Sequence, residues 1–258
     1  MDQPVLMAEA APPKKAPAVA RAVAILKVLA RSEQPMGVNA IARELSIFPS
    51  TCFDILRTLA EDQFVDLDPK TKQYRLGVGL LSVAGALLRK DAMVKLLQPE
   101  LERLSRSHDV TTMMVKVVSL DQVVVVALHH STQILRLNVE VGSRYPALIS
   151  ATGRCVAAFV GAPRETLRTR FARLRWHAAP TFADWLGEVG EARARGYGVD
   201  RENYIAGVTV LAAPIFDHCE AMTHAIVAVG RSHEVDRIGI ETLGPAIAVL
   251  GKRATADS

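Results

Sequence analysis

Side chains able to contact nucleic acid recur at helical spacing within residues 49–61. They share one face at positions i, i+3, i+4 and i+7, and they are Ser50, Phe53, Asp54 and Arg57. On such a face an arginine reaches guanine or a phosphate, and a carboxylate accepts a hydrogen bond from cytosine N4. The opposite face is an apolar stripe made of Cys52, Ile55, Leu56 and Leu59. A solvated face of an ordinary amphipathic helix carries the same pattern, so the spacing alone leaves both interpretations open.

A group of cations follows this helix within a short hairpin pattern. Phe64–Leu67 and Gln73–Leu76 alternate like strands, and Asp68–Thr71 between them is a turn signal. Three cations lie at the tip of this hairpin or beside it, and they are Lys70, Lys72 and Arg75. At a hairpin tip such charges would meet the DNA backbone, where they position a protein rather than select a sequence.

A candidate anion site lies where a later helix is expected to begin. The run Ser150-Ala151-Thr152-Gly153 enters the expected helix Gly153–Val160, with Thr152 as its N-cap. Backbone amides at the start of a helix bind anions, so this run would suit a carboxylate. A plain capped helix start is the simpler interpretation of the same residues.

Two clusters raise the alternative of an enzyme, a hydrolase that uses Cys219 or Cys155. They are His218-Cys219-Glu220 and His129-His130. A cysteine nucleophile needs a base within reach, whereas neighbouring side chains on a strand point to opposite faces. A surface turn is favoured for 217–220, and two histidines leave a tetrahedral metal ion short of ligands. We therefore expect no catalytic residue, no metal and no cofactor.

The elements that would position the nucleic-acid face are two further helices and a tight turn. Ala18–Arg31 is expected to bury a stripe of Val19, Ala22, Val23, Leu26 and Leu29. A second short helix, Val38–Leu45, is separated from the helix that begins at Pro49 by four residues, which suits a helix-turn-helix bend. Three helices followed by a hairpin predict a winged helix-turn-helix, which places a helix in the major groove of DNA.

Length and composition allow a second domain. The chain has 258 residues, half of them apolar, and no apolar run approaches a membrane span. Residues 1–90 contain 12 Lys and Arg against 9 Asp and Glu, so the basic excess lies in the N-terminal third. Residues 1–17 are rich in Ala and Pro and are expected to be a disordered tail. Three widely spaced cysteines favour a reducing cytoplasm over a disulfide framework.

The remaining chain predicts a sheet covered by helices. Strands flanked by helices, in pairs rather than in strict βαβ alternation, indicate a mostly antiparallel sheet in an α+β protein. The last helix is expected to kink at Pro245, and Thr181 with Asp184 is typical of a helix start. The expected helices and strands are Gly77–Arg89, Val94–His108, Thr112–Ser119, Gln122–His130, Gly153–Val160, Phe182–Arg195, Val208–Phe216, Met222–Gly230 and Val235–Arg253.

Both halves resemble one family, the IclR family of bacterial transcriptional regulators. The N-terminal matches are R-A-x-x-I-L, the I-A pair, S-T-x-x-x-x-L-x-T-L and Y-R-L-G, in the family's order and spacing. The C-terminal matches are S-A-T-G-R-C-V-A-A-F and R-G-Y-G-V-D-R-E-N-Y-I-A-G-V-T-V-L-A-A-P-I-F-D. The resemblance implies a winged helix-turn-helix at 18–77, a linker helix at 78–90 and a GAF-like effector-binding domain at 91–254. The residues expected to contact DNA are Arg21, Asn39, Ser50, Thr51, Phe53, Asp54, Arg57, Lys70 and Lys72.

The resemblance also implies a small-molecule effector, a small organic acid bound on one side of the C-terminal sheet. The residues expected to bind it are Ser150, Ala151, Thr152, Gly153, Asp200, Val208, Val210, Ala228 and Gly230. Relatives that bind very small acids carry Cys or Ser at the positions of Val210, Ala228 and Gly230. We therefore expect a larger, less polar acid, aromatic or of medium chain length. Asp200 could equally be a loop carboxylate in water.

Two residues of the N-terminal half depart from the pattern of the family. Asp54 stands where the family usually has Arg, and Gln63 stands where it usually has the Gly that follows the recognition helix. The expected partners are a palindromic double-stranded DNA operator, the effector and further copies of the chain, as a dimer or a dimer of dimers. No membrane contact is expected. In a third interpretation, the C-terminal half serves only as an oligomerisation platform.

Overall fold

The computed structural model describes residues 16–131 and 139–256, and it divides the chain into two compact units. The division falls between Leu87 and Leu88, inside helix α4 (Gly79–Lys90), which is the helix expected to link two domains. The expected tail lies mostly outside the described residues, and helix α1 begins at Pro17. Each unit has a core of its own.

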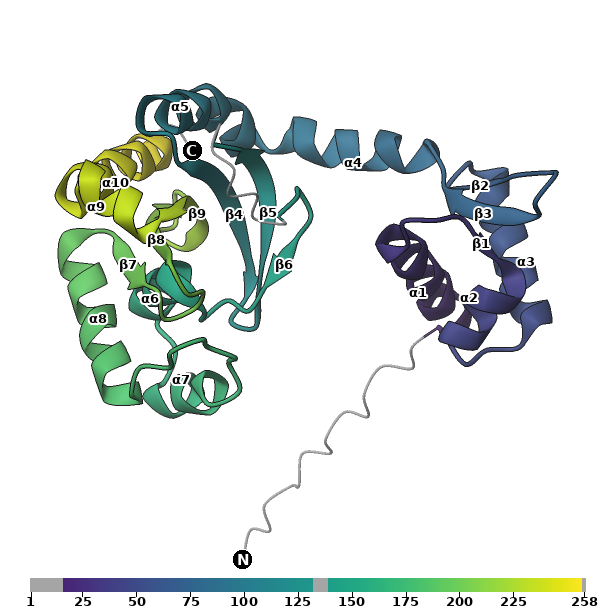
Figure 1. Ribbon diagram of the computed structural model, residues 1–258, viewed down its shortest axis with the longest axis horizontal. Coiled ribbons are helices and arrows are strands. Elements are labelled where there is room, and N and C mark those ends of the chain that lie inside the picture. The colour runs from purple at the N-terminus through teal and green to yellow at the C-terminus, as the bar shows by residue number, and fades with distance from the viewer. Residues whose placement is uncertain (1–15, 132–138, 257–258) are drawn as a thin grey trace, which may run out of the picture. The chain divides into compact units, whose positions relative to one another are not determined.

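The N-terminal unit is a winged helix-turn-helix, which confirms the expected fold (Figure 1). Its sheet has the order β1-β3-β2 with antiparallel neighbours, and β1 was not expected because two residues carry no alternation. Before α4, the elements are α1 (Pro17–Arg31), β1 (Met36–Gly37), α2 (Val38–Glu44), α3 (Pro49–Glu61), β2 (Val65–Leu67) and β3 (Gln73–Leu76).

The buried face of α1 differs from the apolar stripe expected from the sequence. Val19 and Val23 are 63% and 44% exposed, whereas Ile25 and Val28 are buried with Leu29. Apolar residues surround nearly the whole of α1, so periodicity alone could not identify its buried face. The core consists of Ile25, Leu29, Ile41, Ala42, Cys52, Leu56, Val65 and Tyr74.

Gln63 stands after α3 at the position where the family resemblance leads us to expect glycine. It adopts the left-handed backbone conformation that a glycine would adopt there. Its φ is 58°, and the amide of Phe64 donates to the carbonyl of Leu59 at 2.8 Å, which closes the helix end. A side chain in this conformation costs about 1–2 kcal/mol. The helix therefore ends as it would with a glycine, at a small cost in stability.

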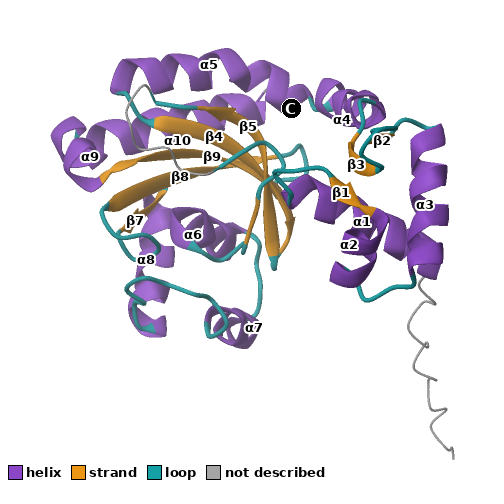
Figure 2. Ribbon diagram, turned by 45° about the vertical axis from the view of Figure 1, so that its right-hand side comes forward, coloured by secondary structure: helices purple, strands orange, loops and turns teal. Residues whose placement is uncertain are grey.

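The C-terminal unit is a six-stranded sheet with helices on both faces (Figure 2). The strand order is β6-β5-β4-β9-β8-β7, and all neighbours are antiparallel, which confirms the expected α+β architecture. Its strands are β4 (Thr111–Ser119), β5 (Gln122–His129), β6 (Arg144–Tyr145), β7 (Gly198–Arg201), β8 (Val208–Phe216) and β9 (Met222–Arg231). Its helices are α5 (Ala92–His108), α6 (Ser150–Phe159), α7 (Arg164–Phe171), α8 (Phe182–Arg195), α9 (Ser232–Ile238) and α10 (Ile240–Ala256).

Two apolar clusters lie on the two faces of this sheet. One packs the sheet against α6 and α8, with Trp185 fully buried, and the other packs it against α5 and α10 (Figure 2). Because both faces are covered, β8 and β9 are buried along almost their whole length. The sequence of a strand that is buried on both faces is almost continuously apolar. It therefore does not indicate which residues face α6 and α8 and which face α5 and α10.

The C-terminal helix differs from its expectation. The single helix Val235–Arg253 with a kink at Pro245 is wrong, because α9 ends at Ile238 and α10 begins at Ile240. The break is at Gly239, whose φ of 91° suits glycine. Pro245 lies inside α10.

Candidate functional site

The candidate nucleic-acid surface is the polar face of α3. Ser50, Phe53, Asp54 and Arg57 are all exposed, and Cys52 and Leu56 on the opposite side are fully buried. Thr51 is half-buried, whereas Arg21 on α1 and Asn39 on α2 are exposed. The burial of the apolar stripe fixes which face of α3 remains available to a partner.

The turn between β2 and β3 is closed by hydrogen bonds to Asp68 and presents two exposed lysines. The Asp68 carboxylate accepts hydrogen bonds from the backbone amides of Lys70 at 2.8 Å and Thr71 at 3.3 Å. These bonds lower the pKa of Asp68 below its usual value. Lys72 has a φ of 56°, and the side chains of Lys70 and Lys72 are exposed. The turn therefore holds its backbone in place while its cations extend into solvent.

The candidate effector site is a cavity in the C-terminal unit, between the sheet and the start of α6. Its volume of ≈ 80 Å³ offers room for a small molecule. Most of its wall is apolar, and the polar groups are those of Tyr145, Ser150, Thr152 and Tyr204. The full lining is Met113, Val115, Val123, Val139, Tyr145, Pro146, Ile149, Ser150, Thr152, Tyr204, Ile205, Val210, Val227 and Val229.

Three of the nine residues expected to bind an effector line this cavity. They are Ser150, Thr152 and Val210. Asp200 does not line the cavity, but it is the β7 residue that pairs with Val210 of β8. Ala151, Gly153 and Val208 are buried beside it without lining it.

Ala228 and Gly230 of β9 lie outside the lining of this cavity. Val227 and Val229 line the cavity, and successive side chains on a strand point to opposite faces. Ala228 therefore belongs to the cluster under α5 and α10, and a Cβ at Gly230 would meet Val235 and Val110. Because both faces of β9 are buried, the sequence alone does not show which of its residues face the cavity.

The start of α6 differs from its expectation in two ways. The helix begins at Ser150 with Ile149 as its N-cap, so Thr152 is inside the helix and does not cap it. Ser150 is a non-glycine residue with a φ of 57°, and backbone strain of this kind often occurs at functional positions. In contrast, the Thr181 cap of α8 is confirmed, because its hydroxyl oxygen accepts from the amide of Asp184 at 3.1 Å.

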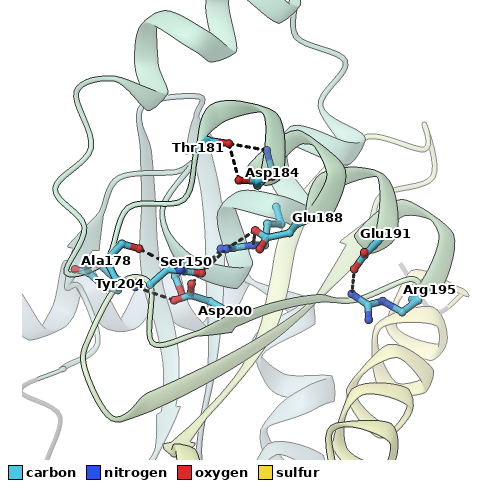
Figure 3. A network of polar contacts seen from close by, with 11 residues as sticks. Ser150, Ala178, Thr181, Asp184, Glu188, Glu191, Arg195, Asp200 and Tyr204 are labelled. Carbon is cyan, nitrogen blue, oxygen red and sulfur yellow. Dashed lines mark hydrogen bonds and ion pairs between the residues drawn. The ribbon is translucent and has the colours of Figure 1, made fainter.

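A buried polar network supports the cavity wall from behind (Figure 3). Asp200 is fully buried, which rules out a loop carboxylate in water. Its Oδ2 accepts hydrogen bonds from the Ser150 hydroxyl and the Tyr204 amide, both at 3.2 Å. Burial raises the pKa of Asp200, and the Arg154 guanidinium, 3.3 Å from Oδ1, opposes that rise.

Sequence reasoning missed Arg154, Glu188, Asn203 and Tyr204. Arg154 lies in the small-residue run of α6, and its side chain is only 1% exposed. The charge of an arginine among small buried residues was the available signal, because a buried charge needs partners nearby. The partners come from α8 and from the loop after β7, which no local pattern connects to α6.

The two cysteine candidates do not form a catalytic arrangement. Cys155 is buried, donates to the carbonyl of Ala212, and has its pKa raised by burial to about 12, which disfavours a thiolate nucleophile. Cys219 is exposed in the turn between β8 and β9, as expected for 217–220. Within residues 16–131 and 139–256, no group of three His, Cys, Asp or Glu side chains could hold a metal ion. In the same residues, no helix is long and apolar enough to cross a membrane.

Comparison with family models gives matches over both units. Residues 18–69 match the IclR helix-turn-helix domain, and residues 85–253 match the description "Bacterial transcriptional regulator IclR C-terminal". The glycerol operon regulatory protein of Streptomyces griseus is 31% identical over 225 residues, which cover 84% of this chain and 85% of that protein.

Solved structures share the fold over nearly the whole chain. An IclR transcriptional regulator from Alicyclobacillus acidocaldarius matches with a TM-score of 0.81 at 23% identity, covering 93% of this chain and 98% of its own. An IclR homologue from Microbacterium hydrocarbonoxydans, solved in complex with 4-hydroxybenzoate, matches with a TM-score of 0.77 at 18% identity. That match covers 93% of this chain and all of the other.

Proposed function

The chain belongs to the IclR family of bacterial transcriptional regulators, and from this we propose that it binds a palindromic operator and releases or retains it in response to a small organic acid. The exposed face of α3 beside the lysines of the wing carries the DNA half of the proposal. In helix-turn-helix proteins the second helix of the motif enters the major groove, where four base pairs are distinguishable. Binding to DNA would place the protein in the bacterial cytoplasm.

The operator would be bound by two copies of the chain or by a dimer of dimers. Paired recognition helices meet half-sites one or more helical turns apart, so a palindrome reflects a two-fold protein. The exposed side chains of Val19 and Val23 on α1, together with α4, offer apolar surface for such pairing.

The wing lysines are expected to contribute affinity without specificity. Lys70→Ala and Lys72→Ala should each weaken binding to specific and random DNA alike and reduce the salt slope of log K by about 1. Fluorescence anisotropy on both DNAs at several salt concentrations measures this. Lys95→Ala, an exposed lysine of the C-terminal unit, serves as the matched control and should leave the slope unchanged.

The effector half of the proposal rests on the cavity. Its wall is apolar apart from two tyrosines, Ser150 and Thr152, which favours a ring or short hydrocarbon body with few polar groups. The amides at the start of α6 are the expected partners of a carboxylate. The fold relative solved with 4-hydroxybenzoate supports an aromatic acid as the first compound to test.

Calorimetry is expected to detect 4-hydroxybenzoate or a similar aromatic acid and to give weaker binding, or none, of pyruvate and glyoxylate. Val210→Phe should abolish the binding because the ring fills the cavity, and the thermal midpoint of that variant reports whether it folds. Tight binding of glyoxylate or pyruvate with no aromatic acid bound would contradict the proposed effector class.

An effector changes DNA binding only if its affinity differs between two arrangements of the protein. Unchanged operator affinity across a broad panel of organic acids would therefore favour the alternative, in which the C-terminal half is an oligomerisation platform. The hydrolase alternative predicts that a Cys155→Ala, Cys219→Ala double variant loses its activity. The buried thiol of Cys155 supports the regulator instead.

A further inference from the structure

Arg154 of α6 is buried, and its guanidinium contacts four residues from other parts of the C-terminal unit. Its Nε donates to Glu188 of α8 at 2.8 Å, and its Nη2 donates to Asn203 at 3.0 Å. Its Nη1 lies 3.3 Å from Asp200 of β7, and its guanidinium lies 5.8 Å from the centre of the Trp176 ring. An arginine buried to this extent needs compensating partners, and here they include two carboxylates.

Asp200 connects this arginine to the cavity wall. The wall residues Ser150 and Tyr204 come from the start of α6 and from the loop after β7, and both donate to the same carboxylate oxygen (Figure 3). That oxygen therefore joins two segments that are separate in the sequence. Both bonds are stronger when the carboxylate is ionised, and the ionised form also pairs with Arg154 through its other oxygen, Oδ1.

The charge of Asp200 is costly at this position. The carboxylate is fully buried, and burial raises its pKa above the usual range. Among the described residues, the groups that face it are Arg154 and Ser150 of α6 and Tyr204 of the loop. Glu188 of α8 also pairs with Arg154, so one positive charge is opposed by two carboxylates. The side chain of Glu188 is 36% exposed.

We propose that Arg154 is the counter-ion that keeps Asp200 ionised, so that Asp200 holds Ser150 and Tyr204 in the shape of the cavity wall. Arg154 is then a positioning residue that sets affinity for the occupant without touching it. The effector part of this inference rests on the proposed function, whereas the counter-ion part is testable without any effector.

The first arm of the test measures unfolding of the full chain by denaturant at pH 5 and pH 8. Arg154→Gln should lower the equilibrium constant for folding by about 100-fold or more at pH 8, because it leaves a buried carboxylate without its partner. At pH 5 the loss should be at least about tenfold smaller, because an unpaired buried carboxyl takes up a proton. In the Arg154→Gln, Asp200→Asn double variant this pH dependence should disappear.

Two further variants separate charge from packing. Arg154→Lys keeps the positive charge without the planar fork, so it should remove most of the pH dependence while still losing stability. Arg195→Gln, on α8 and paired to Glu191 near the surface, is the matched control and should show no pH-dependent loss. An equal loss for Arg154→Gln at both pH values would overturn the counter-ion role and leave Arg154 a packing residue.

The second arm measures the affinity for 4-hydroxybenzoate, or for the aromatic acid that the wild type binds best. Arg154→Gln should weaken it by about tenfold or more at a temperature where the variant is folded, with non-specific DNA binding unchanged. Wild-type affinity in that variant would overturn the positioning role. If the wild type binds no organic acid, the proposed effector function fails, while the first arm still decides the role of Arg154.

Discussion

Replacing Arg57 by alanine is expected to weaken binding to the selected operator by about 10- to 100-fold and to leave binding to random DNA almost unchanged. Arg57 is exposed on the face of α3 that its buried stripe turns away from the core. A bidentate contact of an arginine with guanine is worth about 1–3 kcal/mol of discrimination against the wrong base. Arg57 is the only arginine among the described residues of α3, and the neighbouring position on its face, Asp54, is acidic.

Competition binding with operator, single-base variants and random DNA measures this effect. The matched control is Arg175→Ala, an exposed arginine of the C-terminal unit, which should change neither affinity. Equal losses on specific and random DNA for Arg57→Ala would show that this side chain contacts only phosphate.

Replacing Gly153 by alanine is expected to destabilise the C-terminal unit by about 3 kcal/mol or more and to abolish effector binding. A Cβ at this position would lie 2.0 Å from the backbone carbonyl of Leu148, where no flexible side chain can move aside. Overpacking commonly costs about 1–3 kcal/mol, and a clash with backbone belongs at the upper end. The start of α6, and with it Ser150 in the cavity wall, would have to shift.

Gly190→Ala is the matched control for this substitution. Gly190 lies inside α8 with no atom near the position of its missing Cβ, so alanine should stabilise the protein by about 0.5–1 kcal/mol. Differential scanning calorimetry compares the two variants. A Gly153→Ala protein as stable as wild type would contradict the close approach of α6 to Leu148.

The winged helix-turn-helix could be predicted closely because its information is local. The turn 68–71, the helix that begins at Pro49 and the alternation around Tyr74 each specify a structure within a few residues. The buried face of α1 could not be predicted in the same way. Its apolar residues surround the helix, so tertiary packing rather than periodicity decided that Ile25 is buried and Val19 is exposed.

The cavity was harder to predict because its wall is assembled from distant segments. The motif at 150–153 and the residue Asp200 were identified, yet their connection through Arg154 depends on a contact between α6 and β7. The orientation of Ala228 and Gly230, away from this cavity, was hard to predict for a similar reason. When both faces of a strand are buried, only the structure shows which residues face the cavity.

A regulator of this kind has to bind a specific DNA sequence, and we propose that this chain does so through its N-terminal unit. The most direct measurement is selection of bound fragments from the source genome's DNA, followed by binding measurements on the enriched fragments at two salt concentrations. We expect an enriched palindrome whose binding survives the higher salt, with its half-sites one or more helical turns apart. Selection that enriches no sequence, or binding that vanishes at the higher salt with and without 4-hydroxybenzoate, would contradict this proposal.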